Sequence, residues 1–146
     1  MLYLDTSFLA PLVRGESRAA AVERYVNRAS REGVAVSRLT ELELRSVVAR
    51  EVRMRHIAPR LASELIAELM ARIDETMQIW TPEVKDFVLA GKFVMRFETG
   101  LRAPEALHLA IAENRGAKLM LTLDRGLLKA AKTLGIPASH GIQLVF

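Results

Sequence analysis

The chain opens Met1-Leu2-Tyr3-Leu4-Asp5-Thr6-Ser7, a short apolar run followed by a carboxylate and two hydroxyls. A run of this length that ends abruptly in polar residues predicts a buried strand over residues 1–4. The pattern returns near the other end of the chain, where Leu119-Met120-Leu121-Thr122-Leu123 leads into Asp124. These two predicted strands, each followed directly by an aspartate, determine how the rest of the sequence is interpreted.

Further short apolar runs predict more strands, and amphipathic segments between them predict helices. The other strands are expected at residues 34–36, 77–80 and 143–146, and the helices at residues 19–29, 39–53, 59–75, 82–97, 104–114 and 125–134. Prolines near three of the predicted helix starts, and glycines after two predicted helix ends, agree with these limits. The alternation predicts an α/β fold, a three-layer α/β/α sandwich around a mostly parallel five-stranded sheet.

Size and composition favour one intracellular domain. A chain of 146 residues with 51% hydrophobic residues can bury one core, so residues 1–146 are expected to form a single domain. The absence of cysteine excludes disulfides and thiolate zinc sites, and it fits the reducing cytoplasm. No leader-like or membrane-length apolar run is present, so a cytoplasmic protein is expected. The net charge of +4, carried largely by arginine, favours a polyanionic partner.

Four acidic residues are candidates for a metal site. In open parallel sheets ligands bind beyond the carboxyl ends of the strands, where Asp5 and Asp124 are expected. Glu43 follows the second predicted strand, and Glu105 stands at the start of a later helix. At separations of about 4 Å, each like-charge pair would cost about 4 kcal/mol at an effective dielectric constant near 20, so a cation would be required. Oxygen ligands of this kind suit Mg²⁺, or Mn²⁺.

Each of these acids also has a purely structural interpretation. Asp5 and Asp124 could each cap the start of a helix. Thr40 and Glu43 have the spacing of a capping box, and the helix dipole alone could explain Glu105. The prediction of a metal site therefore depends on the four acids together and on a sheet that would bring them to one crevice.

The order of these elements resembles the PIN-domain family, and specifically the VapC type of toxin–antitoxin ribonuclease, along almost the whole chain. Four segments carry the resemblance: Leu4-Asp5-Thr6-Ser7, Glu43-Leu44-Arg45-Ser46-Val47-Val48-Ala49-Arg50, Glu105-Ala106-Leu107-His108-Leu109-Ala110 and Leu121-Thr122-Leu123-Asp124-Arg125-Gly126-Leu127-Leu128. The resemblance implies a parallel α/β/α sandwich with a site of three or four acids. It also implies Mg²⁺- or Mn²⁺-dependent endoribonuclease activity, a homodimer and inhibition by a cognate antitoxin.

Carried over residue by residue, the resemblance makes Asp5, Glu43, Glu105 and Asp124 the metal ligands and catalytic residues. Thr6 and Thr122 become supporting hydroxyls behind them. Glu105 departs from the family pattern, which most often has aspartate at this position. The extra methylene displaces the carboxylate by more than about 1 Å, which would weaken metal binding or catalysis in a site sensitive to such shifts.

Three further features of the sequence concern contacts with partners or with the core. Arg45, Arg50 and Arg53 belong to a basic stretch that would suit an RNA backbone, or simply form a solvated helix face. His108 lies among apolar residues, which predicts a hydrogen-bonded core residue without a catalytic role. Residues 59–97 contain more large apolar side chains than the core of a small domain can bury, and the excess would form a dimer or antitoxin interface.

The leading hypothesis is a metal-dependent endoribonuclease. The main alternative is a PIN-fold module that binds RNA or antitoxin with its metal site impaired by Glu105. A small-molecule phosphohydrolase would require a second carboxylate close to Asp5 in sequence, which is absent, and no glycine-rich nucleotide-binding motif occurs. The sequence names neither the RNA cleaved nor the number of metal ions.

Overall fold

A single parallel sheet forms the middle of the molecule. The computed structural model describes residues 1–142, and its strands lie in the order β3-β2-β1-β4-β5 with every neighbouring pair parallel. The strands are β1 (Leu2–Leu4), β2 (Val34–Ser37), β3 (Gln78–Trp80), β4 (Leu119–Leu121) and β5 (Ala138–Ser139). The predicted α/β class and the five-stranded parallel sheet are confirmed.

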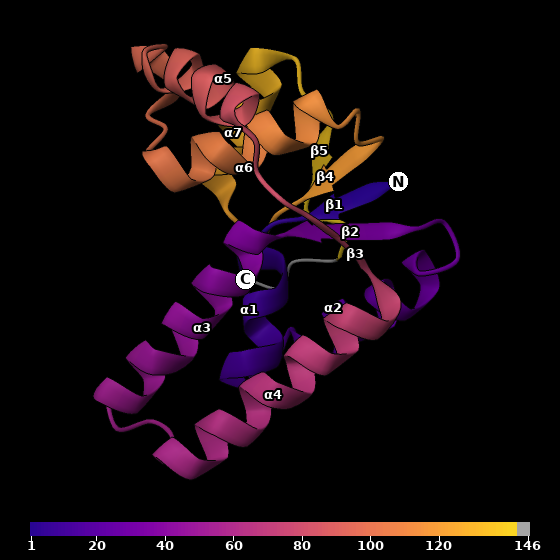
Figure 1. Cartoon of the computed structure of the whole chain (residues 1–146), viewed down its shortest axis with the longest axis vertical. Helices are drawn as coiled ribbons and strands as arrows, with labels where there is room; N and C mark the ends of the chain where they lie inside the picture. Colours follow the sequence, from indigo (N-terminus) through magenta and orange to yellow (C-terminus); the bar gives the residue numbers. More distant parts are fainter. Residues whose placement is uncertain (143–146) are drawn as a thin grey trace.

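Helices cover both faces of the sheet (Figure 1). They are α1 (Thr6–Arg14), α2 (Ala19–Ala29), α3 (Arg38–Arg53), α4 (Pro59–Thr76), α5 (Val84–Val94), α6 (Ala103–Asn114) and α7 (Arg125–Leu134), with a short 3₁₀ helix η1 (Phe97–Thr99). Successive strand residues point to opposite faces, so Leu2 and Leu4 pack with α1 to α4, whereas Tyr3 packs with α6 and α7. Two hydrophobic cores on either side of one sheet make the predicted three layers.

The structure departs from the predicted elements in three places. Helix α1 follows β1 with no loop, and it was not among the predicted helices because it is short and contains Pro11. The helix predicted at residues 82–97 is shorter and gives way to η1. Strand β5 has only two residues, too few to show a pattern, and the strand predicted at residues 143–146 lies outside the described residues.

The connections place one crevice at the centre of the sheet edge. The chain passes outward from β1 to β2 and β3, then returns to the other side of β1 to form β4 and β5. Ligands of open α/β sheets bind where the strand order reverses, which here is between the carboxyl ends of β1 and β4. The Asp5 N–H donates to the Leu121 carbonyl across this point at 3.1 Å. Within residues 1–142 no helix is long and apolar enough to cross a membrane.

Candidate active site

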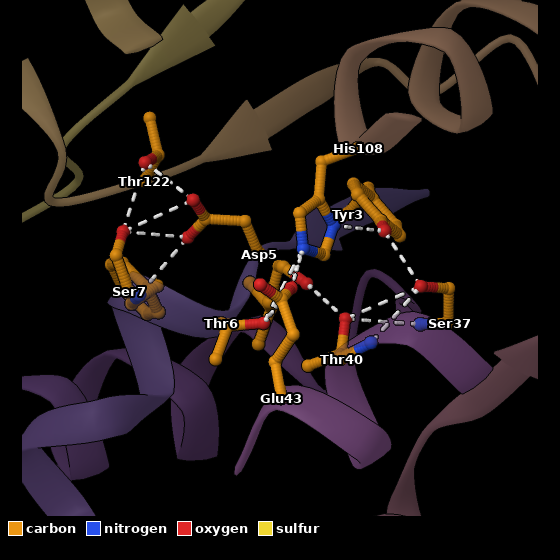
Figure 2. Close-up of polar contacts among 11 residues, drawn as sticks. Tyr3, Asp5, Thr6, Ser7, Ser37, Thr40, Glu43, His108 and Thr122 are labelled. Atoms are coloured by element: carbon orange, nitrogen blue, oxygen red, sulfur yellow. Dashed lines mark hydrogen bonds and ion pairs between the residues drawn. The ribbon is translucent and has the colours of Figure 1, made fainter. Parts of the chain in front are cut away.

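Asp5 lies at the carboxyl end of β1 and is only 3% exposed. Its Oδ1 accepts the Phe8 N–H at 3.0 Å, so Asp5 caps the start of α1. This is the structural role that the sequence offered for Asp5. Ser7 Oγ donates to both carboxylate oxygens at 2.8 and 3.1 Å, and Thr122 Oγ1 donates to Oδ2 at 2.7 Å. Figure 2 shows the carboxylate facing these two hydroxyls. Both oxygens of Asp5 are therefore held in a fixed orientation.

Thr122 also connects Asp5 to Asp124. Its Oγ1 accepts the Asp124 backbone N–H at 3.1 Å, so the start of α7 is linked to the Asp5 carboxylate through one hydroxyl. The Asp124 Oδ1 accepts the Leu127 N–H at 3.0 Å, which is the N-cap that the sequence offered as the structural interpretation. Asp124 thus stands at the predicted edge, with one carboxylate oxygen bonded to its own helix.

Glu43 is not part of the capping box that its spacing from Thr40 suggested, and that interpretation is wrong. Helix α3 begins at Arg38, one residue before the predicted helix, and its box is formed by Ser37 and Thr40 through reciprocal backbone contacts of 3.3 Å. The Glu43 side chain instead reaches across to other elements. Its Oε1 accepts from Thr6 Oγ1 at 2.8 Å and lies 2.5 Å from His108 Nε2.

His108 lies behind Glu43 and is 3% exposed. Its Nδ1 is 2.7 Å from the Tyr3 hydroxyl, and its Nε2 is 3.3 Å from Thr6 Oγ1. The prediction of a hydrogen-bonded core histidine is confirmed. Its place in the sequence did not predict that its partner is the candidate ligand Glu43. The available signal was a single polar side chain within the wholly buried run from Ala106 to Ala112.

Glu105 occupies the start of α6, where its Oε2 accepts the Arg102 N–H at 3.0 Å. The structure therefore ties Glu105 and Asp124 to helix starts, whereas Thr6 connects the Asp5 segment to Glu43. Across residues 1–142 no three acidic or histidine side chains lie close enough together to hold a metal ion. Assembly of all four acids around one ion remains a prediction.

The two interior carboxylates have opposite electrostatics. Burial raises the pKa of Asp5 above its ordinary value, and the nearby His108 and the hydroxyl hydrogen bonds only partly oppose it. Burial also acts to raise the pKa of Glu43, but the hydrogen bond and charge of His108 and the hydrogen bond from Thr6 outweigh it and lower that pKa. Within the described part of the chain, neither carboxylate has an ion pair with lysine or arginine. Carboxylate oxygens of this kind suit a hard cation.

Comparison with known proteins identifies the family. The model of the PIN domain family matches residues 2–133. The chain belongs to the PIN-domain family. It is 27% identical over 140 residues to Ribonuclease VapC35 of Mycobacterium tuberculosis, a match that covers 93% of each chain.

Solved structures share the fold of this PIN domain. Mycobacterium tuberculosis VapC20, a Sarcin-Ricin loop cleaving toxin, superposes with a TM-score of 0.70 at 19% identity, over 89% of this chain and 95% of that one. VapBC2 of Rickettsia felis, bound to a DNA fragment from its promoter, superposes with a TM-score of 0.71 at 13% identity, over 95% of this chain and 98% of that one. FitAB bound to a DNA fragment superposes with a TM-score of 0.75 at 18% identity, over 100% of this chain and 99% of that one. These likenesses establish the fold.

The arginines predicted to contact RNA lie exposed on α3 of the PIN domain. Arg45 and Arg53 also line a cavity of about 350 Å³ between α3 and α4, together with Val48 and Ile66. At 100° per residue, Arg50 shares the helix face of Glu43 two turns further along, whereas Arg45 points to the other side. Of the three, Arg50 is therefore best placed to extend a surface that begins at Glu43.

Proposed function

We propose that this PIN domain is a Mg²⁺-dependent endoribonuclease of the VapC toxin type, with Mn²⁺ as an alternative ion. One observation carries the proposal: the carboxylates of Asp5 and Glu43 stand at the sheet's switch point, and among residues 1–142 no ion pair joins either of them to a lysine or arginine. The similarity to Ribonuclease VapC35 along 93% of the chain supports RNA as the substrate.

Asp5 and Glu43 would hold the ion, and Asp124 and Glu105 would complete the ligand set. When bound, such an ion lowers the pKa of a coordinated water and neutralises charge on the scissile phosphate. No protein nucleophile is then required, and hydrolysis leaves 5′-phosphate and 3′-hydroxyl ends.

The surrounding residues contribute orientation. Ser7 and Thr122 fix both oxygens of Asp5, and Thr6 donates to Glu43 while adjoining Asp5 in the chain. Carboxylates locked by such contacts lose little freedom when they bind a ligand, and their supporting groups commonly change metal affinity by about 10–100-fold. We therefore propose that Thr6 and Thr122 fill the supporting roles predicted from the sequence.

A toxin of this type requires partners. Structures of VapBC2 and FitAB, which share the fold, are of complexes bound to DNA fragments. We propose that this chain acts in the cytoplasm, binds a cognate antitoxin and forms a homodimer. Exposed large apolar residues gather on one part of the chain, with Val84, Phe87, Val88, Met95 and Phe97 between 56% and 80% exposed, which supports an interface there. Light scattering of the isolated chain over a dilution series tests the dimer.

The test of activity uses the purified, antitoxin-free chain and structured total RNA. We expect discrete cleavage with Mg²⁺ or Mn²⁺, none with EDTA, and none with Asp5→Asn under any condition. End analysis should find 5′-phosphates. Cyclic phosphates, or cleavage that survives EDTA, would contradict the metal-dependent reaction.

The second candidate is a PIN-fold module that binds RNA or antitoxin without cutting. The use of Glu105 and Asp124 at helix starts favours it, because both carboxylates already have backbone partners. Tight RNA binding without metal-dependent turnover would support this module. Appearance of cleavage in Glu105→Asp alone would identify Glu105 as the cause of the lost activity.

A further inference from the structure

A line of buried polar side chains runs from the sheet interior to Glu43. Tyr3 on β1 is completely buried, and its hydroxyl lies 2.7 Å from His108 Nδ1 and 2.9 Å from Ser37 Oγ. His108 Nε2 on the far side of the ring lies 2.5 Å from Glu43 Oε1. Figure 2 shows His108 between Tyr3 and Glu43. Side chains from β1, α6 and α3 thus form one line that ends at a carboxylate oxygen of Glu43.

The chemistry of the partners determines which ring nitrogen carries a proton. An ionised carboxylate only accepts hydrogen bonds, so Nε2 must bear the hydrogen that faces Glu43. The Tyr3 hydroxyl can accept from Nδ1–H or donate to a bare Nδ1, and either arrangement leaves Nε2–H in place. Tyr3 is itself fixed, because its ring stacks on Trp80 with centroids 5.6 Å apart and planes 2° apart. The imidazole has no freedom to turn away.

The two carboxylate oxygens of Glu43 have different surroundings. Oε1 accepts from both His108 and Thr6, and within residues 1–142 no hydrogen bond to Oε2 is recorded. Glu43 is half-buried, and its side chain is 30% exposed against 4% for His108. One oxygen is therefore anchored on the protein side, which leaves the other available on the open side.

We infer that His108 is a positioning residue that, fixed by Tyr3, aims the Glu43 carboxylate at the proposed metal. This inference rests on the proposed function for its metal, but the contact between His108 and Glu43 does not. Carboxylates that bind a metal are commonly hydrogen-bonded in turn by neighbouring protein groups, and loss of such a supporting group weakens metal affinity about 10–100-fold.

Two amide substitutions separate positioning from packing. In His108→Gln the amide nitrogen stands the same number of bonds from Cα as Nε2, so it keeps the donor to Glu43. In His108→Asn the amide nitrogen corresponds to Nδ1 and does not reach. We expect the Mn²⁺ dissociation constant, measured by electron paramagnetic resonance, to rise about 10–100-fold in His108→Asn and to stay within about threefold in His108→Gln.

A matched control exists on the surface. His56 and Glu51 form another His–Glu pair, with Nδ1 and Oε2 2.8 Å apart, but His56 is exposed. His56→Asn should leave Mn²⁺ affinity unchanged. Equal loss in His108→Gln and His108→Asn, both folded by circular dichroism, would overturn positioning through Nε2–H.

A measurement on the unaltered chain guards against variants that do not fold. Long-range ¹H–¹⁵N correlation spectra of the metal-free, ¹⁵N-labelled protein should show a protonated Nε2 on His108. A ring protonated only at Nδ1 would overturn the inference. If the wild-type chain binds no Mn²⁺ while Nε2 is protonated, the proposed metal site fails and the contact that orients Glu43 stands.

Discussion

The four acids of the site fall into two pairs that the fold treats differently. Asp5 and Glu43 receive hydrogen bonds from side chains distant in the sequence, Thr122 for Asp5 and Thr6 and His108 for Glu43, and Asp5 also caps α1. Glu105 and Asp124 receive theirs from backbone N–H groups at the start of their own helices. A helix cap is satisfied locally and stabilises the fold, whereas carboxylates held by side chains from distant elements mark a candidate functional site.

The largest expected effect that separates the pairs is at Asp5. Asp5→Asn removes a buried charge whose pKa is raised, so we expect the metal-free protein to melt a few degrees higher, since 1 kcal/mol is worth roughly 2–4 °C in domains slightly larger than this. RNA cleavage should fall more than about 100-fold, beyond the loss typical of a supporting group. Differential scanning calorimetry in EDTA and a cleavage assay test both.

The pH dependence of this gain has a defined sign. Because the pKa of Asp5 is raised on folding, its contribution to stability is full below the ordinary aspartate pKa and is lost as pH rises through the folded value. The advantage of Asp5→Asn should therefore grow from acid to neutral pH. Asp86 is the matched control, a completely buried carboxylate that accepts from Asn114 Nδ2 at 2.7 Å. Asp86→Asn should lower the melting temperature and leave cleavage intact, and a stabilising Asp86→Asn would contradict this account.

Glu43→Gln should change stability in the opposite direction. The pKa of Glu43 is lowered on folding, so the stability that it contributes is present above the ordinary glutamate pKa and is lost as pH falls through the folded value. Loss of charge-assisted bonds should cost about 1–3 kcal/mol at neutral pH and less in acid. Urea denaturation in EDTA at several pH values measures it. A destabilisation that does not change with pH would show that the charge of Glu43 is not responsible.

Asp124 tests whether a cap can also serve the site. Asp124→Ala removes the acceptor for Leu127 and should cost about 1 kcal/mol, whereas Asp124→Ser retains a capping oxygen and should cost much less. If Asp124 is also a ligand, both variants should lose cleavage to the same extent. Cleavage that follows stability, lost in alanine and kept in serine, would reduce Asp124 to a cap. Thermal melting and RNA cleavage on the same samples decide between these outcomes.

The fold was predictable because its signals are local. Short apolar runs that end in polar residues locate β1 and β4, and the alternation with helices predicts the parallel sheet and the edge where Asp5 and Asp124 stand. β5 was missed because two residues carry no periodicity. The limits of α1 were missed because the helix begins directly after a strand and contains Pro11.

The site was predictable only in part, because its contacts join residues far apart in sequence. Identifying Glu43 as a candidate needed only its place after β2. The sequence could not show that Glu43 lies outside the capping box, because this depends on α3 starting at Arg38, one residue earlier than predicted. Helix limits are commonly uncertain by one or two residues. The contact from His108 to Glu43 spans 65 residues, and no spacing rule reports such a pairing.

The smallest expected effect is on RNA binding by the arginines of α3. These arginines allow the surface beside Glu43 to be compared with the opposite side of the same helix. Arg50 lies on the face of Glu43, so Arg50→Ala should weaken RNA binding a few-fold and lower the salt slope by about 0.7, the value for one contact with single-stranded nucleic acid. Arg45→Ala should change neither, because residue 45 points to the other side of α3. Fluorescence anisotropy in the Asp5→Asn background, where RNA stays intact, measures both across a salt series. Equal losses at the two positions would mean that RNA contacts the basic helix without regard to the acidic edge, and the link between α3 and the candidate site would be lost.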